Sequence, residues 1–139
     1  MWMESFETCE RGDSMQFDTD VLIWFLRGNE KAAVAVDRED DRRISVVTYM
    51  ELLQGARDKE ESRTIRRFLA DYSFLMVPLT QNIGHRASIY MEEYALQADM
   101  GVADVLIAAT AVENHFVLCT ANHKHYKGIK DLELKIFRP

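Results

Sequence analysis

Long apolar runs are missing from this sequence. The longest, VLIWFL at residues 21–26, is far shorter than the ~20 residues that a helix needs to cross a bilayer. Cysteine is also scarce, and the two that are present, Cys9 and Cys119, show no paired spacing. The N-terminus lacks the charged, apolar and small-residue pattern of a signal peptide. Together these absences predict a cytoplasmic protein that keeps its thiols reduced and does not enter a membrane.

Positive charge is in short supply as well. The chain has a net charge of −6 at pH 7, which argues against broad, nonspecific adhesion to nucleic acid because that adhesion depends on clustered Lys and Arg. Half of this net charge comes from the N-terminus, where Arg11 is outnumbered by four acids: Glu4, Glu7, Glu10 and Asp13. We expect residues 1–14 to form a flexible extension and residues 15–139 to form the functional domain.

Apolar residues make up 47% of the 139 residues and charged residues 29%, which is the balance of a soluble globular domain. From Met15 onward, short apolar runs alternate with helical patterns, as is typical of β-α-β units around a parallel sheet. Strands are predicted at residues 15–18, 42–48, 73–79, 116–120 and 133–137, and helices at residues 20–28, 29–40, 49–72 with a break near Gly55, 80–99 and 103–115. Asn29 and Thr80 are the expected helix caps. The predicted fold is an α/β three-layer α/β/α sandwich with a central, mainly parallel sheet of about five strands.

Several polar residues fall where strands of this sheet are predicted to end. Asp18 closes the first strand, Glu51 lies beyond the second, Asp104 opens the helix before the fourth, and Asn122 follows the fourth. Ligand sites in such sheets gather outside the carboxyl ends of the strands. Three carboxylates brought together would repel one another unless a cation held them, and hard oxygen ligands suit Mg²⁺ or Mn²⁺. Asp18, Glu51 and Asp104 are therefore candidate metal ligands.

Each of these acids also has a simpler explanation by itself. Taken alone, Asp104 is better explained as an N-cap or first-turn acid that the helix dipole favours. Asp18 is explained as a cap of the helix that Asp20 also serves, and Glu51 as a solvated helix residue. It is their coincidence at strand ends that favours a metal site.

Segments from across the chain, in the right order, carry a resemblance to a known family: FDTDVLIWFLRGN, ISVVTYMELLQGA, ADVLIAATAVENHFVLCTANHKHYKGI and LELKIF. Together they resemble PIN-domain proteins, and specifically VapC-type toxins of bacterial type II toxin–antitoxin pairs, over essentially residues 15–139. The resemblance implies a PIN-like fold and a Mg²⁺- or Mn²⁺-dependent endoribonuclease that cleaves cellular RNA. It also implies inhibition by a cognate VapB-like antitoxin, a homodimer, and Asp18, Glu51 and Asp104 as the acids of the metal site.

The sequence departs from the family pattern just after the predicted fourth strand. The fourth acidic position of the wider family is often Asp but is Asn122 here, an uncharged and weaker metal ligand. Many VapC-type sequences resemble this one in carrying Asn there, so we expect Asn122 to take part in catalysis, with one or two metals left open. Thr120 matches the family's threonine before that position, whereas Ala121 replaces the Arg or Lys commonly between them.

Other side chains are candidates for contact with RNA or a partner. Arg27, Lys124 and His125 flank the predicted strand ends and are expected to bind RNA, as is Thr120 by the resemblance; a solvated surface role is the alternative for the charged ones. The helix predicted at residues 20–28 has more apolar side chains than one core-facing surface needs. This suggests a dimer or antitoxin surface, with simple burial as the alternative. The apolar stripe comprises Val21, Leu22, Trp24, Phe25 and Leu26.

Two other functions stay open on the sequence. DTDV after a strand also resembles the opening motif of haloacid-dehalogenase-like phosphatases, with Asp18 as nucleophile and Asp20 as acid. Against this, the late acid Asp99 follows a predicted helix instead of a strand. The second is a catalytically idle module that binds RNA or a protein partner, which Asn122 and the low positive charge would suit.

Overall fold

Five short parallel strands form the centre of the structure, a computed structural model that describes residues 14–139. They are β1 (Met15–Phe17), β2 (Arg42–Ser45), β3 (Leu75–Val77), β4 (Val117–Thr120) and β5 (Leu134–Ile136). Their order across the sheet is β3-β2-β1-β4-β5, and every neighbouring pair is parallel. Each strand falls within a range predicted from the sequence, so the predicted parallel sheet is confirmed.

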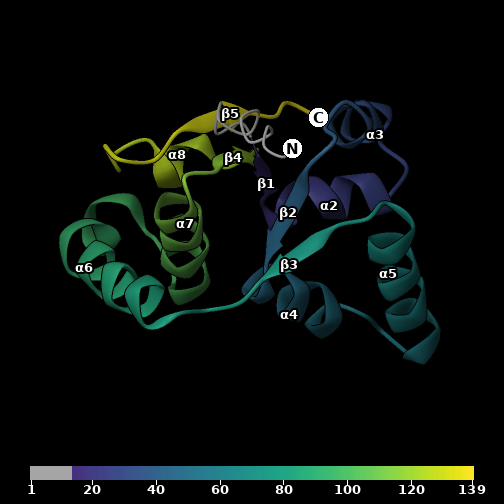
Figure 1. The fold of residues 1–139 in the computed structure, drawn as a ribbon, viewed down its shortest axis with the longest axis horizontal. Helices are drawn as coiled ribbons and strands as arrows, with labels where there is room; N and C mark the ends of the chain where they lie inside the picture. The colour runs from purple at the N-terminus through teal and green to yellow at the C-terminus, as the bar shows by residue number, and fades with distance from the viewer. Residues whose placement is uncertain (1–13) are drawn as a thin grey trace, which may run out of the picture.

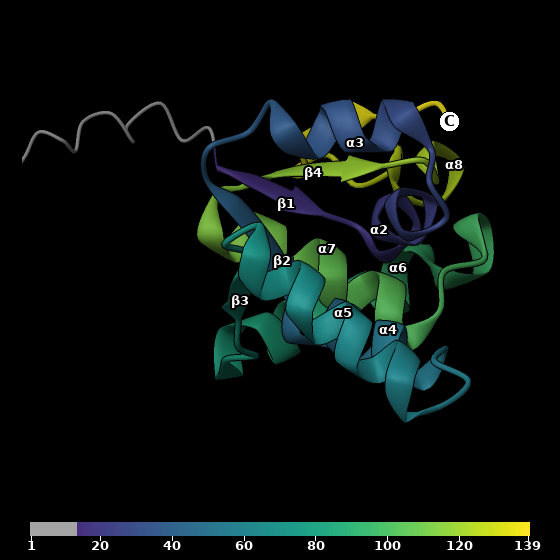
Figure 2. The same cartoon turned by 90° about the vertical axis from the view of Figure 1, so that its right-hand side faces the viewer.

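Helices cover both faces of this sheet, as the two views in Figures 1 and 2 show. Within the described residues they are α2 (Thr19–Leu26), α3 (Glu30–Asp37), α4 (Val46–Gln54), α5 (Lys59–Asp71), α6 (Gln81–Ala98), α7 (Val102–Asn114) and α8 (His123–Tyr126). In Figure 1, α6 and α7 lie on one side of the sheet, and α2, α3 and α5 lie on the other. The predicted three-layer α/β/α sandwich is therefore confirmed.

Short polar side chains set where several helices begin. The side chains of Asn29 and Thr80 accept hydrogen bonds from the backbone N–H groups of Ala32 and Ile83, as predicted for N-caps. Gly28 has φ of +89°, a left-handed conformation that glycine adopts without a steric penalty. It lets the chain turn sharply between α2 and α3, and the predicted stop of the first helix at this glycine is thus explained.

The boundary between β2 and α4 differs from the prediction. The β-branched run predicted a strand through residue 48, but the strand ends at Ser45 and Val46 already begins α4. The Ser45 side chain accepts a hydrogen bond from the Val47 backbone N–H at 3.0 Å and so caps the helix. Capping, together with burial of Val47 in a core, overrides the strand preference of β-branched residues. The short helix α8 was not predicted.

Two apolar cores hold the layers together, one on each face of the sheet. One gathers buried side chains of α6, α7 and α8, and the other gathers those of α2, α3 and α5. Helix α4 contributes to both, because Val47 packs into the first core and Leu52 into the second. Glu51, which precedes Leu52, is therefore on a helix that is anchored from both sides.

The central strand β1 also fixes the position of α7. Gln16 is fully buried in β1, and its side-chain amide donates a hydrogen bond to the carbonyl of Ile107 at 3.0 Å. Ile107 lies about one helical turn after Asp104 on α7. This bond therefore holds Asp104 in a defined place relative to the end of β1, where Asp18 follows.

The structure bears on the predictions of no membrane-spanning segment and of reduced cysteines. No helix in residues 14–139 is long and apolar enough to cross a membrane. Cys119 is a buried free thiol, and burial raises its pKa to about 12. Cys9 lies outside the described residues, as does the predicted N-terminal extension apart from Ser14.

Candidate active site

A cleft of about 380 Å³ opens at the carboxyl edge of the sheet. Its walls are formed by Asp18, Thr19, Asp20, Ile23, Glu51, Gln54, Gly55, Asp104 and Asn122. The residues that the strand-end argument selected therefore meet at one place, although they come from distant parts of the chain. Asp20 joins them, whereas the sequence had suggested it only as a helix acid and as part of the phosphatase alternative.

Asp18 follows β1 directly and is 5% exposed. One carboxylate oxygen, Oδ1, accepts a hydrogen bond from the backbone N–H of Thr19 at 2.8 Å, and Oδ2 accepts one from the Thr120 hydroxyl at 2.7 Å. Burial, followed by the nearby charge of Asp20, raises the pKa of Asp18 to about 7 in spite of these two bonds. Asp18 caps α2, and within residues 14–139 no Lys or Arg forms an ion pair with it.

Asp20 lies in the first turn of α2 and reaches across to the segment after β4. Its Oδ2 accepts a hydrogen bond from the backbone N–H of Ala121 at 3.1 Å. Its other oxygen, Oδ1, is buried and has no hydrogen-bond partner within the described residues. Burial raises the pKa of Asp20 above its ordinary value, and the charge of Asp104 adds to the effect.

Glu51 is connected to the cleft through Thr19. The Thr19 hydroxyl donates a hydrogen bond to Oε1 of Glu51 at 2.6 Å and lies 3.1 Å from the hydroxyl of the buried Thr48. Glu51 is half-buried and hydrogen-bonded to Thr19, which favours a place in the site over the alternative of a solvated helix residue. The bond joins α4 to the start of α2 beside Asp18.

Asp104 is a first-turn acid of α7 and also lines the cleft. Its Oδ2 accepts a hydrogen bond from the backbone N–H of Gly101 at 2.9 Å, which stabilises the start of α7. Its Oδ1 lies 3.4 Å from the hydroxyl of the buried Tyr126, and the Nδ1 atom of His125 lies 3.6 Å from Oδ2. The first-turn acid of α7 therefore also faces the cleft.

The end of β4 and the residues that follow it support the site in a way that was not predicted. Thr120 is fully buried, and its hydroxyl holds Asp18 while accepting a hydrogen bond from the backbone N–H of Asn122 at 2.9 Å. The expected contact between Thr120 and RNA is therefore wrong, because the side chain has no surface to offer. Asn122 is exposed at the cleft, with its amide side chain free of any capping bond.

The predicted basic residues lie around the cleft and do not line it. Arg27 is exposed at the end of α2, and Lys124 is exposed on α8. His125 is half-buried, and its imidazole ring lies close to the carboxylate of Asp104. Contact of these three residues with RNA stays a prediction.

The donor set of the cleft fits a hard divalent cation. Carboxylate oxygens are what Mg²⁺ and Mn²⁺ prefer, and two observations indicate uncompensated negative charge: the raised pKa of Asp18 and the partnerless Oδ1 of Asp20. As the side chains of residues 14–139 stand, no three acids, histidines or cysteines enclose a metal position. Glu51 and Asp104 are instead directed to Thr19 and Gly101 by their hydrogen bonds.

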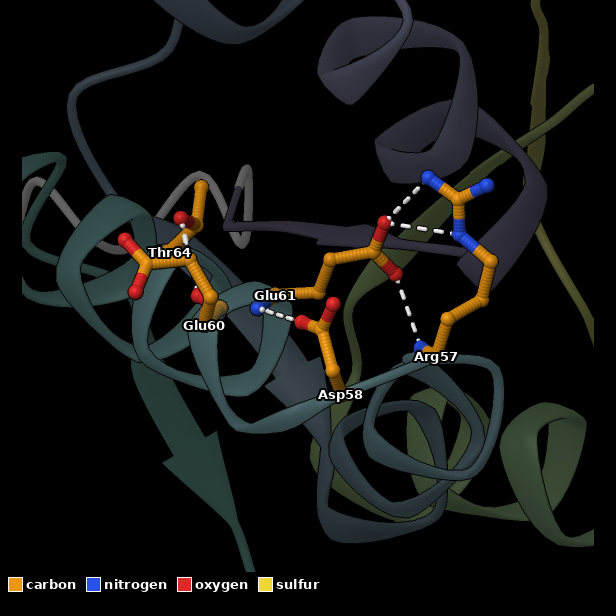
Figure 3. A network of polar contacts seen from close by, with 5 residues as sticks. All are labelled: Arg57, Asp58, Glu60, Glu61 and Thr64. Carbon is orange, nitrogen blue, oxygen red and sulfur yellow. Dashed lines mark hydrogen bonds and ion pairs between the residues drawn. The ribbon is translucent and has the colours of Figure 1, made fainter.

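A larger groove of about 710 Å³ adjoins the cleft and shares Ile23, Glu51 and Gly55 with it. The rest of this groove is formed by Leu26, Arg27, Leu52, Ala56, Arg57, Glu61, Thr64 and Ile65. Figure 3 shows its charged rim. Glu61 accepts hydrogen bonds there from the backbone N–H and the guanidinium of Arg57. The side chain of Asp58 caps the start of α5. The groove thus joins an apolar floor and a charged rim to the acidic cleft.

The apolar stripe on α2 is mostly core. Val21 and Leu22 are fully buried, and Phe25 packs against Phe68 with ring centroids 4.6 Å apart. Of the stripe, Leu26 lines the groove at 36% exposed, and it is joined there by Ile23, equally exposed, which was not part of the predicted stripe. The suggestion that the whole stripe forms a partner surface is therefore wrong, and burial in the sandwich explains most of it.

A parallel α/β/α sandwich with clustered acids at its carboxyl edge is the arrangement of a PIN domain, and the family model described as PIN domain matches residues 15–130. The chain belongs to the PIN-domain family. Membership rules out the phosphatase alternative, and Asp20 needs another explanation.

Similar proteins narrow the comparison to VapC-type members of that family. Ribonuclease VapC10 of Mycobacterium tuberculosis is 38% identical over 120 residues, which cover 84% of this chain and 88% of the relative. Ribonuclease VapC of Rickettsia bellii is 29% identical over 123 residues, or 84% and 91% of the two chains. A solved toxin–antitoxin complex from Klebsiella pneumoniae superimposes with a TM-score of 0.73 at 29% identity, over 86% of this chain and 95% of that one. The resemblance inferred from the sequence is confirmed.

Proposed function

We propose that this chain is an endoribonuclease toxin that cleaves cellular RNA with Mg²⁺ or Mn²⁺ and is inhibited by a cognate VapB-like antitoxin. The observation that carries the proposal is the meeting of Asp18, Glu51 and Asp104 in one cleft of a PIN fold. The ribonuclease names of similar proteins support the reaction. The Klebsiella complex supports the kind of partner.

Each residue of the cleft has a proposed role. Asp18 and Asp104 would hold the cation, and Glu51 would bind it through water or orient the attacking water. When bound, the cation would supply a lowered pKa for water and offset the charge that builds on the attacked phosphate. Thr120 and Thr19 keep the carboxylates of Asp18 and Glu51 in place. Asn122 would donate a hydrogen bond to the substrate, since it can both donate and accept.

The antitoxin is proposed to lie in the groove beside the cleft. Ile23 and Leu26 expose apolar surface there, and Ile23 and Glu51 belong to both hollows. An occupant of the groove would therefore reach the entrance of the acidic cleft and obstruct RNA.

We also propose that the protein acts in the cytoplasm as a homodimer. The outer strand β3 exposes Leu75 and Met76 at one edge of the sheet. Exposed apolar edge strands are surfaces that proteins usually cover. Light scattering after gel filtration measures the dimer directly, and a monomer at all concentrations would contradict it.

The proposed reaction is tested on purified protein with structured RNAs, with Mg²⁺, with Mn²⁺ and with a chelator. Cleavage is expected only with the cation, and Asp104→Asn is expected to abolish it while leaving the circular dichroism spectrum unchanged. Asp71→Asn, an exposed acid at the end of α5, is the control and should cut normally. RNA binding without cation-dependent cleavage would favour the idle binding module, which the neutral Asn122 keeps as the second candidate.

A further inference from the structure

Asp20 lies close to Asn122, the position at which the wider family often has its fourth acid. Its Oδ2 accepts a hydrogen bond from the backbone N–H of Ala121, the residue directly before Asn122. Asp20 and Asn122 both line the acidic cleft. The first turn of α2 thus brings a carboxylate to the wall on which position 122 offers only a neutral amide.

The surroundings of Asp20 do not explain it as a structural acid alone. The Val21 N–H and the Thr120 hydroxyl interact with the Asp20 carboxylate and lower its pKa, but its buried Oδ1 forms no hydrogen bond of normal geometry within residues 14–139, and a buried polar atom without such a bond is unfavourable. In the same part of the chain, no Lys or Arg forms an ion pair with Asp18, Asp20 or Asp104. The dipole of α2 favours an acid in its first turn, but that alone does not require one oxygen to be left buried and unbonded.

We propose that Asp20 is the fourth carboxylate of the metal site, in the role that Asn122 does not fill. The proposal rests on the proposed function for the presence of the cation. Divalent cations such as Mg²⁺ bind through a few carboxylates, and Asp20 adds one to the set of Asp18, Glu51 and Asp104. The site therefore keeps four acidic groups although its sequence position after β4 holds Asn.

The test measures Mn²⁺ binding without RNA, from the electron paramagnetic resonance signal of free Mn²⁺. Asp20→Asn keeps an oxygen that can accept from the Ala121 N–H, and it is expected to weaken Mn²⁺ binding at least about tenfold. Asp71→Asn removes the same charge from an exposed position and should leave the affinity unchanged. Adding Asn122→Asp to Asp20→Asn should recover most of the loss, because a carboxylate returns to the same wall of the cleft.

An unchanged Mn²⁺ affinity in Asp20→Asn would overturn the proposal, whether or not the variant is less heat-stable. So would a loss that Asn122→Asp fails to recover, because Asp20 would then only position the segment after β4. If Asp20→Asn does not fold by circular dichroism, Asp20→Ser carries the same comparison, since Ser also suits the start of a helix. A wild-type protein that binds Mn²⁺ but cuts no RNA would contradict the proposed function and leave the role of Asp20 intact. A wild-type protein that binds no Mn²⁺ would overturn both.

Discussion

Replacing Asp18 by Asn in the metal-free protein should make it more stable, and the gain should depend on pH. Each pKa unit corresponds to ~1.4 kcal/mol, so raising the pKa of Asp18 from 3.8 to about 7 destabilises the ionised folded protein by at most about 4 kcal/mol. Asn cannot ionise and escapes this cost. Its oxygen can still accept from the Thr19 N–H and its NH₂ group can donate to the Thr120 hydroxyl, and Asn caps helices as well as Asp does.

The sign of the pH dependence follows from the raised pKa. Between about pH 4 and pH 7 the unfolded chain has lost the Asp18 proton and the folded protein has kept it, so the free energy of unfolding falls as pH rises through this interval. Below it, both states are protonated and the cost is absent. Above it, the full cost is present. The wild-type protein should therefore lose stability as the pH rises from about 4 to about 7. In Asp18→Asn, the part of this pH dependence that is due to Asp18 should disappear.

Urea unfolding followed by circular dichroism, with a chelator present, measures the effect. Asp18→Asn is expected to exceed the wild-type free energy of unfolding by ~2–4 kcal/mol near pH 8 and by little near pH 4. If the proposed metal site is correct, added Mn²⁺ should narrow or reverse the difference near pH 8, because a ligand that binds only the folded wild-type protein stabilises it. The reasoning is that burial and the charge of Asp20 make ionisation of Asp18 unfavourable in the folded protein. A variant that is less stable than wild type near pH 8, or a gain in stability of equal size at both pH values, would refute it.

Three further predictions test the core, the groove and the RNA contacts. Leu22→Ala, at a fully buried position of α2, should lower the free energy of unfolding by ~2–5 kcal/mol; an unchanged urea midpoint would contradict the packing described. Leu26→Asp should weaken antitoxin binding by at least about tenfold in calorimetry while RNA cleavage stays normal, and equal affinity would exclude the groove as the antitoxin site. Lys124→Glu in an Asp104→Asn background should weaken RNA binding in fluorescence anisotropy and reduce its salt dependence. The same reversal at Arg66, exposed on α5, should have no such effect.

The sequence was sufficient for the fold and for most of the site because both follow from one rule of topology. Alternating strands and helices dictate a parallel sheet, and a parallel sheet puts all carboxyl ends on one edge. Asp18, Glu51 and Asp104 could be placed together without knowledge of any contact. Where the prediction failed at the end of β2, the capping bond that Ser45 accepts, together with burial of Val47, outweighed the strand preference of the residues that follow.

Asp20 and Thr120 show what sequence position cannot reveal. An acid in the first turn of a helix is common for reasons of helix stability, so nothing in DTDV indicates that Asp20 belongs to a metal site. What sets it apart is a bond to Ala121, which lies 101 residues further along the chain. Thr120 could be recognised as part of the pattern, but which way the last side chain of a strand points depends on register, and here it points inward to Asp18.

The acids of the cleft are oriented mainly by backbone N–H groups. Asp18 accepts from Thr19, Asp20 from Ala121 and Asp104 from Gly101. A Lys or Arg in these places would cancel the negative charge and occupy the site. An N–H group fixes an oxygen but brings no net charge, so the repulsion among the acids is reduced without being removed. The protein can therefore fold without a cation, and under the proposed function it would still gain stability from binding one at a site that is already fixed.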